Sequence, residues 1–219
     1  MFDGFCLKLG YFFNFKTDDR EFGIKFCLGV FLGFLLVPSP VLAEVEPWYT
    51  YWSIGMSDNK YPKDIQQDFD SIASLPGVER TEIAMDMLGF YWPLRSNSFK
   101  NSKTILGFVV SVSADAFDDR YKHFQVNQYL TSLSTMHFFG EEPGDSFFVR
   151  GDIGSSKMVI QTDYIRNEVI DGGYGYLVGT GYGFPVSEAS RLLLGINYSS
   201  RVIESETYSS VSLTVGGLW

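Results

Sequence analysis

The end of the chain, Tyr208–Trp219, alternates between two kinds of side chain. One face carries Val211, Leu213, Val215, Gly217 and Trp219, and the other carries Ser210, Ser212, Thr214, Gly216 and Leu218. A period of two, with one apolar face and one small, polar face, predicts a strand whose two sides meet different surroundings. The chain stops on this strand at an aromatic residue. This alternation carries more information about the location and architecture of the protein than about its activity.

Seven earlier segments have the same strand character, which gives eight predicted strands. They are Trp48–Ser57, Thr81–Trp92, Lys103–Ala114, Asn127–Phe139, Phe147–Gly154, Tyr174–Phe184, Arg191–Ile203 and Tyr208–Trp219. Most have the length of about 9–11 residues that a tilted strand needs to cross the hydrocarbon layer. An even number of strands with both ends on one side fits a closed antiparallel barrel. The predicted fold is all-β: an eight-stranded, antiparallel, up-and-down transmembrane β-barrel.

The predicted connections fall into two length classes. Short connections are expected at 93–102, 140–146 and 185–190, longer ones at 58–80, 115–126 and 155–173, and a shorter one near 204–207. Outer-membrane barrels have short periplasmic turns and longer external loops, so Glu44 and Trp219 are expected in the periplasm. In the first external loop, Ile65, Phe69, Ile72 and Leu75 fall three or four residues apart. This spacing predicts a short amphipathic helix within Pro62–Leu75 that packs on the barrel rim.

The composition of the two strand faces distinguishes a membrane barrel from a soluble one. In the sixth segment the bulky face is Tyr174, Tyr176, Val178, Thr180, Tyr182 and Phe184, and the opposite face is mostly glycine. The small face carries too little charge for a water-facing exterior, and the bulky face would overfill an eight-stranded interior. The bulky face is therefore expected to meet lipid. Aromatic residues near strand ends are expected to form interfacial girdles: Trp48, Tyr91, Trp92, Tyr174, Tyr208 and Trp219.

The first part of the chain has the character of a cleavable signal peptide. Arg20 and Lys25 accompany an apolar run that prolines interrupt, and the run ends in Val41-Leu42-Ala43. Residues 1–43 are expected to be an N-terminal extension with this signal peptide, and residues 44–219 the barrel domain; an uncleaved anchor is the alternative. Both cysteines lie before Glu44, which excludes disulfides and thiolate chemistry from the mature chain. Cleavage removes four basic and four acidic residues, so the net charge stays at −9 and nucleic-acid binding is not expected.

The ionisable residues that we single out within the predicted strands are Glu82, Asp86, Arg150 and Asp152. A charge that faces lipid is costly, at about 2–4 kcal/mol for a basic residue at the bilayer midplane. Alternation should therefore turn these side chains inward, with Phe147, Val149, Gly151 and Ile153 outward. We expect a structural salt-bridge network in the lumen. A gate or proton path is the alternative, because buried charges in membrane proteins can mark conduits.

With these features in place, Glu44–Trp219 resembles the small bacterial outer-membrane β-barrel family, which includes OmpX and the transmembrane domain of OmpA. The resemblance rests on the signal peptide, the eight amphipathic strands, the run GYLVGTGYGFPVSEASRLLLGINYS and the terminal Trp219. Gly217 departs from it, because the closing signal of the family usually has a bulky residue there. The resemblance implies outer-membrane lipid and the barrel-assembly machinery, through the C-terminal strand, as partners.

Lipid-modifying enzymes with this architecture provide a test for catalysis. Small-barrel lipid A deacylases use a His-x-Ser pair, and the comparable segment here is Asn197-Tyr198-Ser199, with asparagine in place of the base. His123 and His137 are not next to a serine and an acid at useful spacing. No phosphate-loop or metal-ligand spacing occurs. We therefore expect no enzyme, no cofactor and no metal, and a structural or surface-interaction role with an unidentified surface partner. The alternatives are a narrow pore for small, possibly apolar, molecules and, third, a lipid-modifying enzyme.

Overall fold

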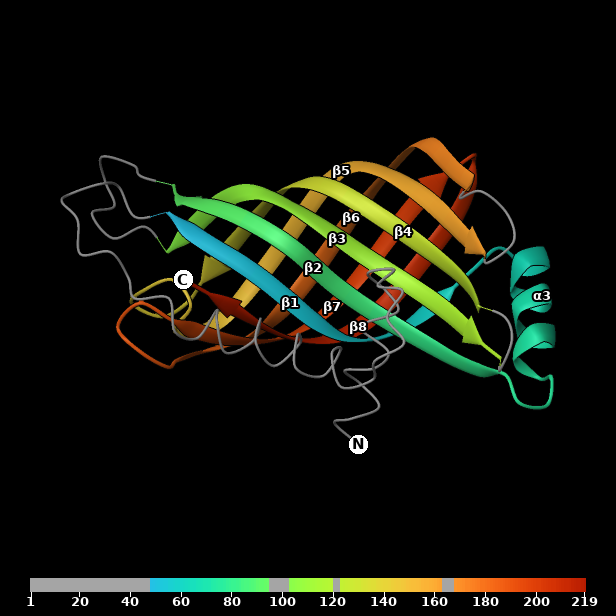
Figure 1. Cartoon of the computed structure of the whole chain (residues 1–219). Coiled ribbons are helices and arrows are strands. Elements are labelled where there is room, and N and C mark those ends of the chain that lie inside the picture. The colour runs from blue at the N-terminus through green and yellow to red at the C-terminus, as the bar shows by residue number, and fades with distance from the viewer. Residues whose placement is uncertain (1–47, 95–102, 120–122, 163–167) are drawn as a thin grey trace. The chain divides into compact units, whose positions relative to one another are not determined.

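The computed structural model describes residues 48–94, 103–119, 123–162 and 168–219 as a closed barrel. In these residues the strands are β1 (Tyr49–Lys60), β2 (Glu79–Pro93), β3 (Thr104–Asp118), β4 (His123–Phe138), β5 (Ser146–Thr162), β6 (Glu168–Pro185), β7 (Arg191–Ile203) and β8 (Glu206–Leu218). Consecutive strands pair antiparallel, and β8 pairs with β1, so the predicted eight-stranded barrel is confirmed (Figure 1). The predicted signal peptide lies outside the described residues.

The seam between β1 and β8 closes the barrel. Its register runs from Tyr51 opposite Leu218 to Lys60 opposite Ser209. Two backbone hydrogen bonds extend it: the Thr50 amide donates to the Trp219 carbonyl at 2.8 Å, and the Trp219 amide donates to the Thr50 carbonyl at 3.0 Å. The final residue of the chain is therefore part of the closure.

Gly217 has a specific role in this seam. The Trp219 ring stacks on the Trp52 ring with 6.1 Å between centroids. A Cβ atom at Gly217 would overlap the Trp219 ring. A bulky side chain at position 217 would therefore displace the terminal ring from its present position, which explains the departure from the family pattern.

Several strands continue further than the sequence predicted. β3 runs to Asp118, β4 begins at His123, and β5 runs to Thr162. The loops predicted at 115–126 and 155–173 are therefore wrong over most of their length. The prediction followed apolar faces, whereas the inner face of β4 in this region is polar and buried, with Gln125 and Asn127 hydrogen-bonded to each other at 2.6 Å.

The helix α3 (Lys63–Ala73) stands at one end of the barrel, opposite the end that holds the C-terminus (Figure 1). We call these the helix end and the terminal end. As predicted, the apolar side of α3 faces the barrel: the Phe69 ring contacts Tyr61 with 4.6 Å and Phe117 with 5.2 Å between centroids. Burial raises the pKa of the Tyr61 hydroxyl. No helix in the described residues is long and apolar enough to cross a membrane.

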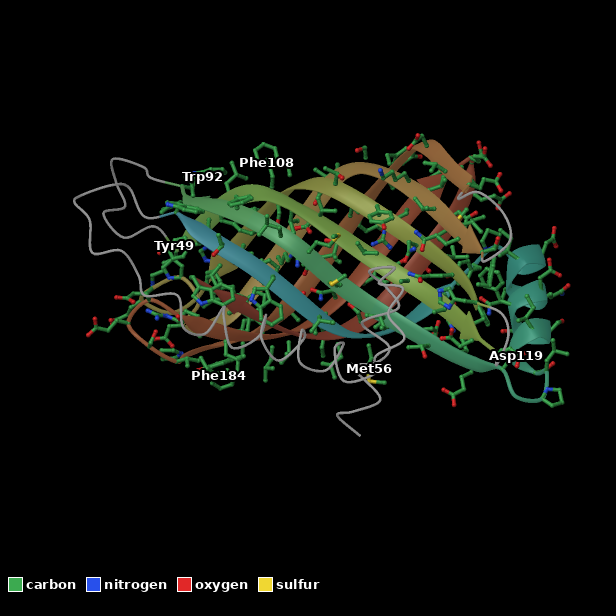
Figure 2. The ribbon with its side chains drawn as sticks, viewed as in Figure 1. Tyr49, Met56, Trp92, Phe108, Asp119 and Phe184 are labelled. Carbon is green, nitrogen blue, oxygen red and sulfur yellow. The ribbon has the colours of Figure 1, made fainter. Side chains whose placement is uncertain are left out.

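The barrel exterior is a continuous display of large apolar side chains. Figure 2 shows Phe108, Met56 and Phe184 pointing away from the barrel wall on different sides, and Phe108 is 61% exposed. Residues exposed in the same way come from every strand, for example Phe90, Leu133, Ile153, Tyr176, Leu194 and Leu213. Such an exterior is unfavourable in water and favourable in lipid. The exterior therefore identifies the protein as an integral membrane barrel.

Two of the predicted girdle residues lie inside the barrel instead. Tyr91 is fully buried, because a β-bulge between Asp86 and Leu88 in β2 reverses which residues face inward. Tyr208 shares its face with Ser210 and packs against the Tyr61 ring, with 6.0 Å between centroids. Both tyrosines fill the lumen, so the girdle prediction is wrong for them.

A test of the lipid-facing surface compares two substitutions of apolar exterior residues by arginine. Ile153 is 69% exposed near the middle of β5, and Val169 is exposed near the helix end of β6. In lipid, Ile153→Arg should lower the free energy of unfolding by about 2–4 kcal/mol and Val169→Arg by about 0–1 kcal/mol. Urea unfolding in phospholipid vesicles measures both. Equal, negligible effects would show that the exterior faces water.

Candidate functional site in the barrel lumen

The lumen has apolar clusters at its two ends and polar groups between them. The terminal cluster consists of Tyr51, Tyr91, Ile105, Val109, Met136, Phe138, Phe148, Leu193 and Leu218. The helix cluster consists of Tyr61, Phe69, Phe117, Val126, Met158, Ile203 and Tyr208. An eight-stranded barrel has room inside only for side chains, and these clusters occupy that room at both ends. The charged groups between them are the strongest candidates for a functional site.

Arg150 is the centre of the first charged group. Its guanidinium lies between two carboxylates: Nη1 is 2.7 Å from Asp86 Oδ2, and Nη2 is 2.6 Å from Asp152 Oδ2. A second pair of bonds, Nη2 to Asp86 Oδ1 at 3.0 Å and Nε to Asp152 Oδ1 at 3.1 Å, makes both contacts bidentate. All three side chains are buried. Bidentate geometry on both sides gives charge-assisted hydrogen bonds in place of the water that burial removes.

Hydroxyl groups complete the partners of these carboxylates. Asp86 accepts hydrogen bonds from Tyr51 at 3.0 Å, from Ser53 at 2.6 Å and from Ser111, while Asp152 accepts one from Ser134. The Arg150 guanidinium also lies 5.3 Å from the centre of the Tyr51 ring. The donors come from β1, β3 and β4 in addition to the charged strands β2 and β5. The hydrogen bonds and ion pairs of the cluster therefore connect strands from different sides of the barrel.

Glu82 lies in a different charged group, closer to the helix end. Arg80 Nη2 is 2.6 Å from Asp115 Oδ2 and 3.1 Å from Glu82 Oε1. Glu82 also accepts a hydrogen bond from the backbone amide of Asn59 at 2.9 Å. The sequence analysis missed Arg80 and Asp115, because both fell within segments predicted to be loops.

Arg201 on β7 is a further buried charge that the sequence analysis missed. Its side chain is on the same inward face as Asn197 and Ser199. The period of two within the predicted strand Arg191–Ile203 was the signal that could have found it. In contrast to Arg150, Arg201 makes no ion pair with any described residue.

The residues considered for catalysis have structural partners. The Asn197 amide donates to Thr214 Oγ1 at 3.2 Å, and Ser199 Oγ lies 2.8 Å from Ser210 Oγ inside the lumen. His137 Nδ1 lies 2.8 Å from Thr104 Oγ1, and His123 Nδ1 lies 2.7 Å from Asp118 Oδ1. Ser199 thus lies in the lumen, away from the lipid that a deacylase would need to reach. Within the described ranges, no group of three or more His, Cys, Asp or Glu residues is placed to hold a metal ion.

Known structures share this architecture. No protein-family model and no curated protein sequence matches the chain. The crystal structure of Neisserial surface protein A superposes with a TM-score of 0.51 at 11% identity, over 78% of this chain and 95% of that one. The chain has the fold of a small bacterial outer-membrane β-barrel. Lower-scoring structures include Ail, the attachment invasion locus protein of Yersinia pestis, at TM-score 0.45, 10% identity and 78% and 99% coverage.

Another lower-scoring structure is the N-terminal β-barrel domain of Pseudomonas aeruginosa OprF. Its TM-score is 0.38 at 14% identity, over 78% of this chain and 97% of that one. Independently of these comparisons, a closed antiparallel barrel with an even number of strands and a lipid-facing apolar exterior is the architecture of bacterial outer-membrane proteins. The exterior of this barrel has that character. The protein is an integral outer-membrane protein.

The Arg150 cluster can be tested by removing its cation. Arg150→Met leaves two buried carboxylates without a counter-charge and should lower the free energy of unfolding by about 3–5 kcal/mol. The combined Asp86→Asn, Arg150→Met, Asp152→Asn variant should recover part of this loss, because no unpaired charge remains. Urea unfolding in vesicles measures each variant.

The matched control is Lys60→Met, which removes an exposed ion pair between Lys60 Nζ and Asp58 Oδ1 at 3.0 Å. This control should change stability by less than about 1 kcal/mol. If Arg150→Met behaved like Lys60→Met, the cluster would have no structural role.

Proposed function

We propose that the protein is a non-conducting outer-membrane barrel with a structural or surface-interaction role. The observation that carries this proposal is the lumen itself, which contains an apolar cluster at each end and hydrogen-bonded charges between them. The described lumen lining leaves a cavity with room for about one water molecule, which is too small for a solute path. The charged residues then serve to hold the strands together.

The helix end supports the surface-interaction part of the proposal. The side of α3 that faces away from the barrel carries Asp64 and Asp68, both exposed. Asp119 lies at the same end of the barrel (Figure 2). Because short turns of outer-membrane barrels are periplasmic, we place this acidic end outside the cell. It would present a negative, helical surface to other molecules.

The proposal assigns no catalytic role to the barrel. A lumenal serine with an asparagine two positions earlier has no activating base, since Asn197 and Ser199 hydrogen-bond to Thr214 and Ser210.

We also propose that the β8 strand and Trp219 are recognised by the barrel-assembly machinery, which must act on the strand that closes the sheet. No cofactor is part of the proposed function.

Planar-bilayer recording separates this function from a pore. The purified, refolded barrel should give no steady ohmic conductance in salt, because both ends of the lumen are filled. An open porin inserted into the same membranes is the positive control. Steady ion flux through the purified protein would contradict the filled lumen and favour the pore.

The enzymatic alternative requires a separate measurement. Lipid A from a strain that lacks the gene should carry the same acyl chains as lipid A from its parent, as mass spectrometry would show. A change in acylation that the intact gene restores would contradict the proposed role.

A further inference from the structure

Arg80 on β2 is shared by three carboxylates at the helix end. Its Nη2 lies 2.6 Å from Asp115 Oδ2 on β3 and 3.1 Å from Glu82 Oε1 on β2. Its Nη1 lies 3.7 Å from Asp70 Oδ1 on α3. We call these four side chains the Arg80 cluster. When all its carboxylates are ionised, the cluster has one positive charge against three negative ones, so its charges do not balance.

Glu82 and Asp115 are also direct partners in the ladder between β2 and β3. Like charges placed opposite each other on neighbouring strands repel, and they repel more strongly where little water screens them. The Asp115 side chain is fully buried, whereas that of Glu82 is 23% exposed. The pair is therefore unfavourable while both groups are ionised, and Glu82 is the member that water reaches.

The Arg80 cluster lies beyond the membrane-spanning part of the barrel. The stretch of β2 from Ile83 to Trp92 has the length of about 9–11 residues that a tilted strand needs to cross the hydrocarbon layer. Glu82 and Arg80 come before this stretch, on the side of the helix end. The cluster can therefore exchange protons with the aqueous medium.

The two partnered carboxylates of β2 and β3 hold Arg80 to different extents. Both oxygens of Asp115 accept from Arg80, from Nε at 3.0 Å and from Nη2 at 2.6 Å, which is a bidentate contact that favours the ionised form. Glu82 has one bond from Arg80 and one from the Asn59 amide. Burial raises the pKa of Glu82; the Asn59 amide opposes this effect, and the charge of Asp115 adds to it. Glu82 is thus the member of the pair on which a proton is expected.

Asp70 connects the charge of the cluster to the docking of α3. The distance between Arg80 and Asp70 is the longest of the three ion pairs, because Arg80 also serves two carboxylates that repel Asp70. The Arg80 guanidinium also lies 5.5 Å from the centre of the Phe117 ring, against which Phe69 of α3 packs. A change of charge in the cluster therefore acts directly on the contact between the helix and the barrel.

We propose that the Arg80 cluster makes the docking of α3 pH-sensitive, with Glu82 as the group that takes up the proton. Protonated Glu82 repels neither Asp115 nor Asp70, and Arg80 is then shared by these two carboxylates alone. The helix is held more firmly in mildly acidic medium than at neutral or alkaline pH. This response concerns how firmly α3 is held and is independent of what the outer side of the helix meets.

The direction of the effect follows from which state binds the proton. A carboxyl group whose pKa is raised by burial under the docked helix binds a proton more readily in the docked state, so the proton stabilises docking. This gain is complete below the ordinary pKa of Glu82 and is lost as the pH rises through the raised value.

Other titratable groups face the cluster or lie beside it at the helix end. Asp58 of β1 is paired with Lys60 at 3.0 Å, and burial raises the pKa of the Tyr61 hydroxyl, which stays neutral at neutral pH. On β4, His123 lies 2.7 Å from Asp118 of β3. Histidine is the side chain whose ordinary pKa falls in the range of interest, so His123 requires a control.

Hydrogen exchange of the barrel in phospholipid vesicles measures the docking of α3. The protection factors of the α3 amides, each corrected for the intrinsic exchange rate at its pH, should be about three- to tenfold larger at about pH 5 than at about pH 8. The amides of β7 provide the internal reference and should show no such difference. Equal protection of α3 at the two pH values, or stronger protection at the higher one, would overturn the proposal.

Glu82→Gln tests the proton acceptor. The variant keeps an oxygen for the Asn59 amide but carries no charge, so α3 should be protected at about pH 8 as strongly as the wild type is at about pH 5. Asp68→Asn, which changes an exposed carboxylate on the outer side of α3, should keep the wild-type response. His123→Gln should keep it as well. A response that persisted in Glu82→Gln or disappeared in His123→Gln would contradict the assignment.

Asp70→Asn keeps the test valid if Glu82→Gln fails to fold. The Asp70 side chain is 61% exposed, so its replacement should be tolerated by the barrel. Without this carboxylate α3 no longer carries the charge that Glu82 repels, and most of the pH response should be lost. An unchanged response in Asp70→Asn would show that the cluster does not control the helix.

Discussion

A strand that crosses hydrocarbon cannot leave its backbone N–H and C=O groups unpaired, and this requirement governs the whole molecule. The β1–β8 seam meets it, because the register that begins at Lys60 opposite Ser209 continues to the last residue of the chain. Closure in turn fixes which face of each strand is outside. Large apolar side chains therefore cover the exterior, and the polar residues have only the lumen available to them.

The narrow lumen then determines how the charges are arranged. A carboxylate inside an eight-stranded barrel has little water to solvate it, so it needs donors from the opposite wall. Asp86 on β2 and Arg150 on β5 meet this need across the barrel, because the two strands are not neighbours in the sheet. Arg201 on β7 instead donates to the Ser113 hydroxyl of β3 across the lumen, and the cavity beside it follows from the small serines that surround it.

The sequence predicted most of the architecture and part of the lumen. Alternation predicted all the strands, and the bounds predicted for Arg191–Ile203 match β7. The failures came where the period of two was interrupted or hidden. The bulge after Asp86 turned Tyr91 inward, and a bulge leaves no distinctive residue pattern in a single sequence. Polar inner faces concealed the start of β2 and the helix ends of β3 to β5, and with them Arg80 and Asp115 as members of a charged group.

The position of the Arg150 cluster has a consequence for the order of assembly. Arg150 and Asp86 are 64 residues apart in the chain and on strands that no single hairpin contains. Neighbouring hairpins can form from local contacts, and Arg150 can meet Asp152 on its own strand, but Asp86 has no guanidinium partner until the sheet curls. A half-formed barrel is thus electrostatically penalised, and the final joining step releases the penalty. The cluster therefore favours the correctly closed sheet and disfavours misaligned sheets that would leave Arg150 in lipid.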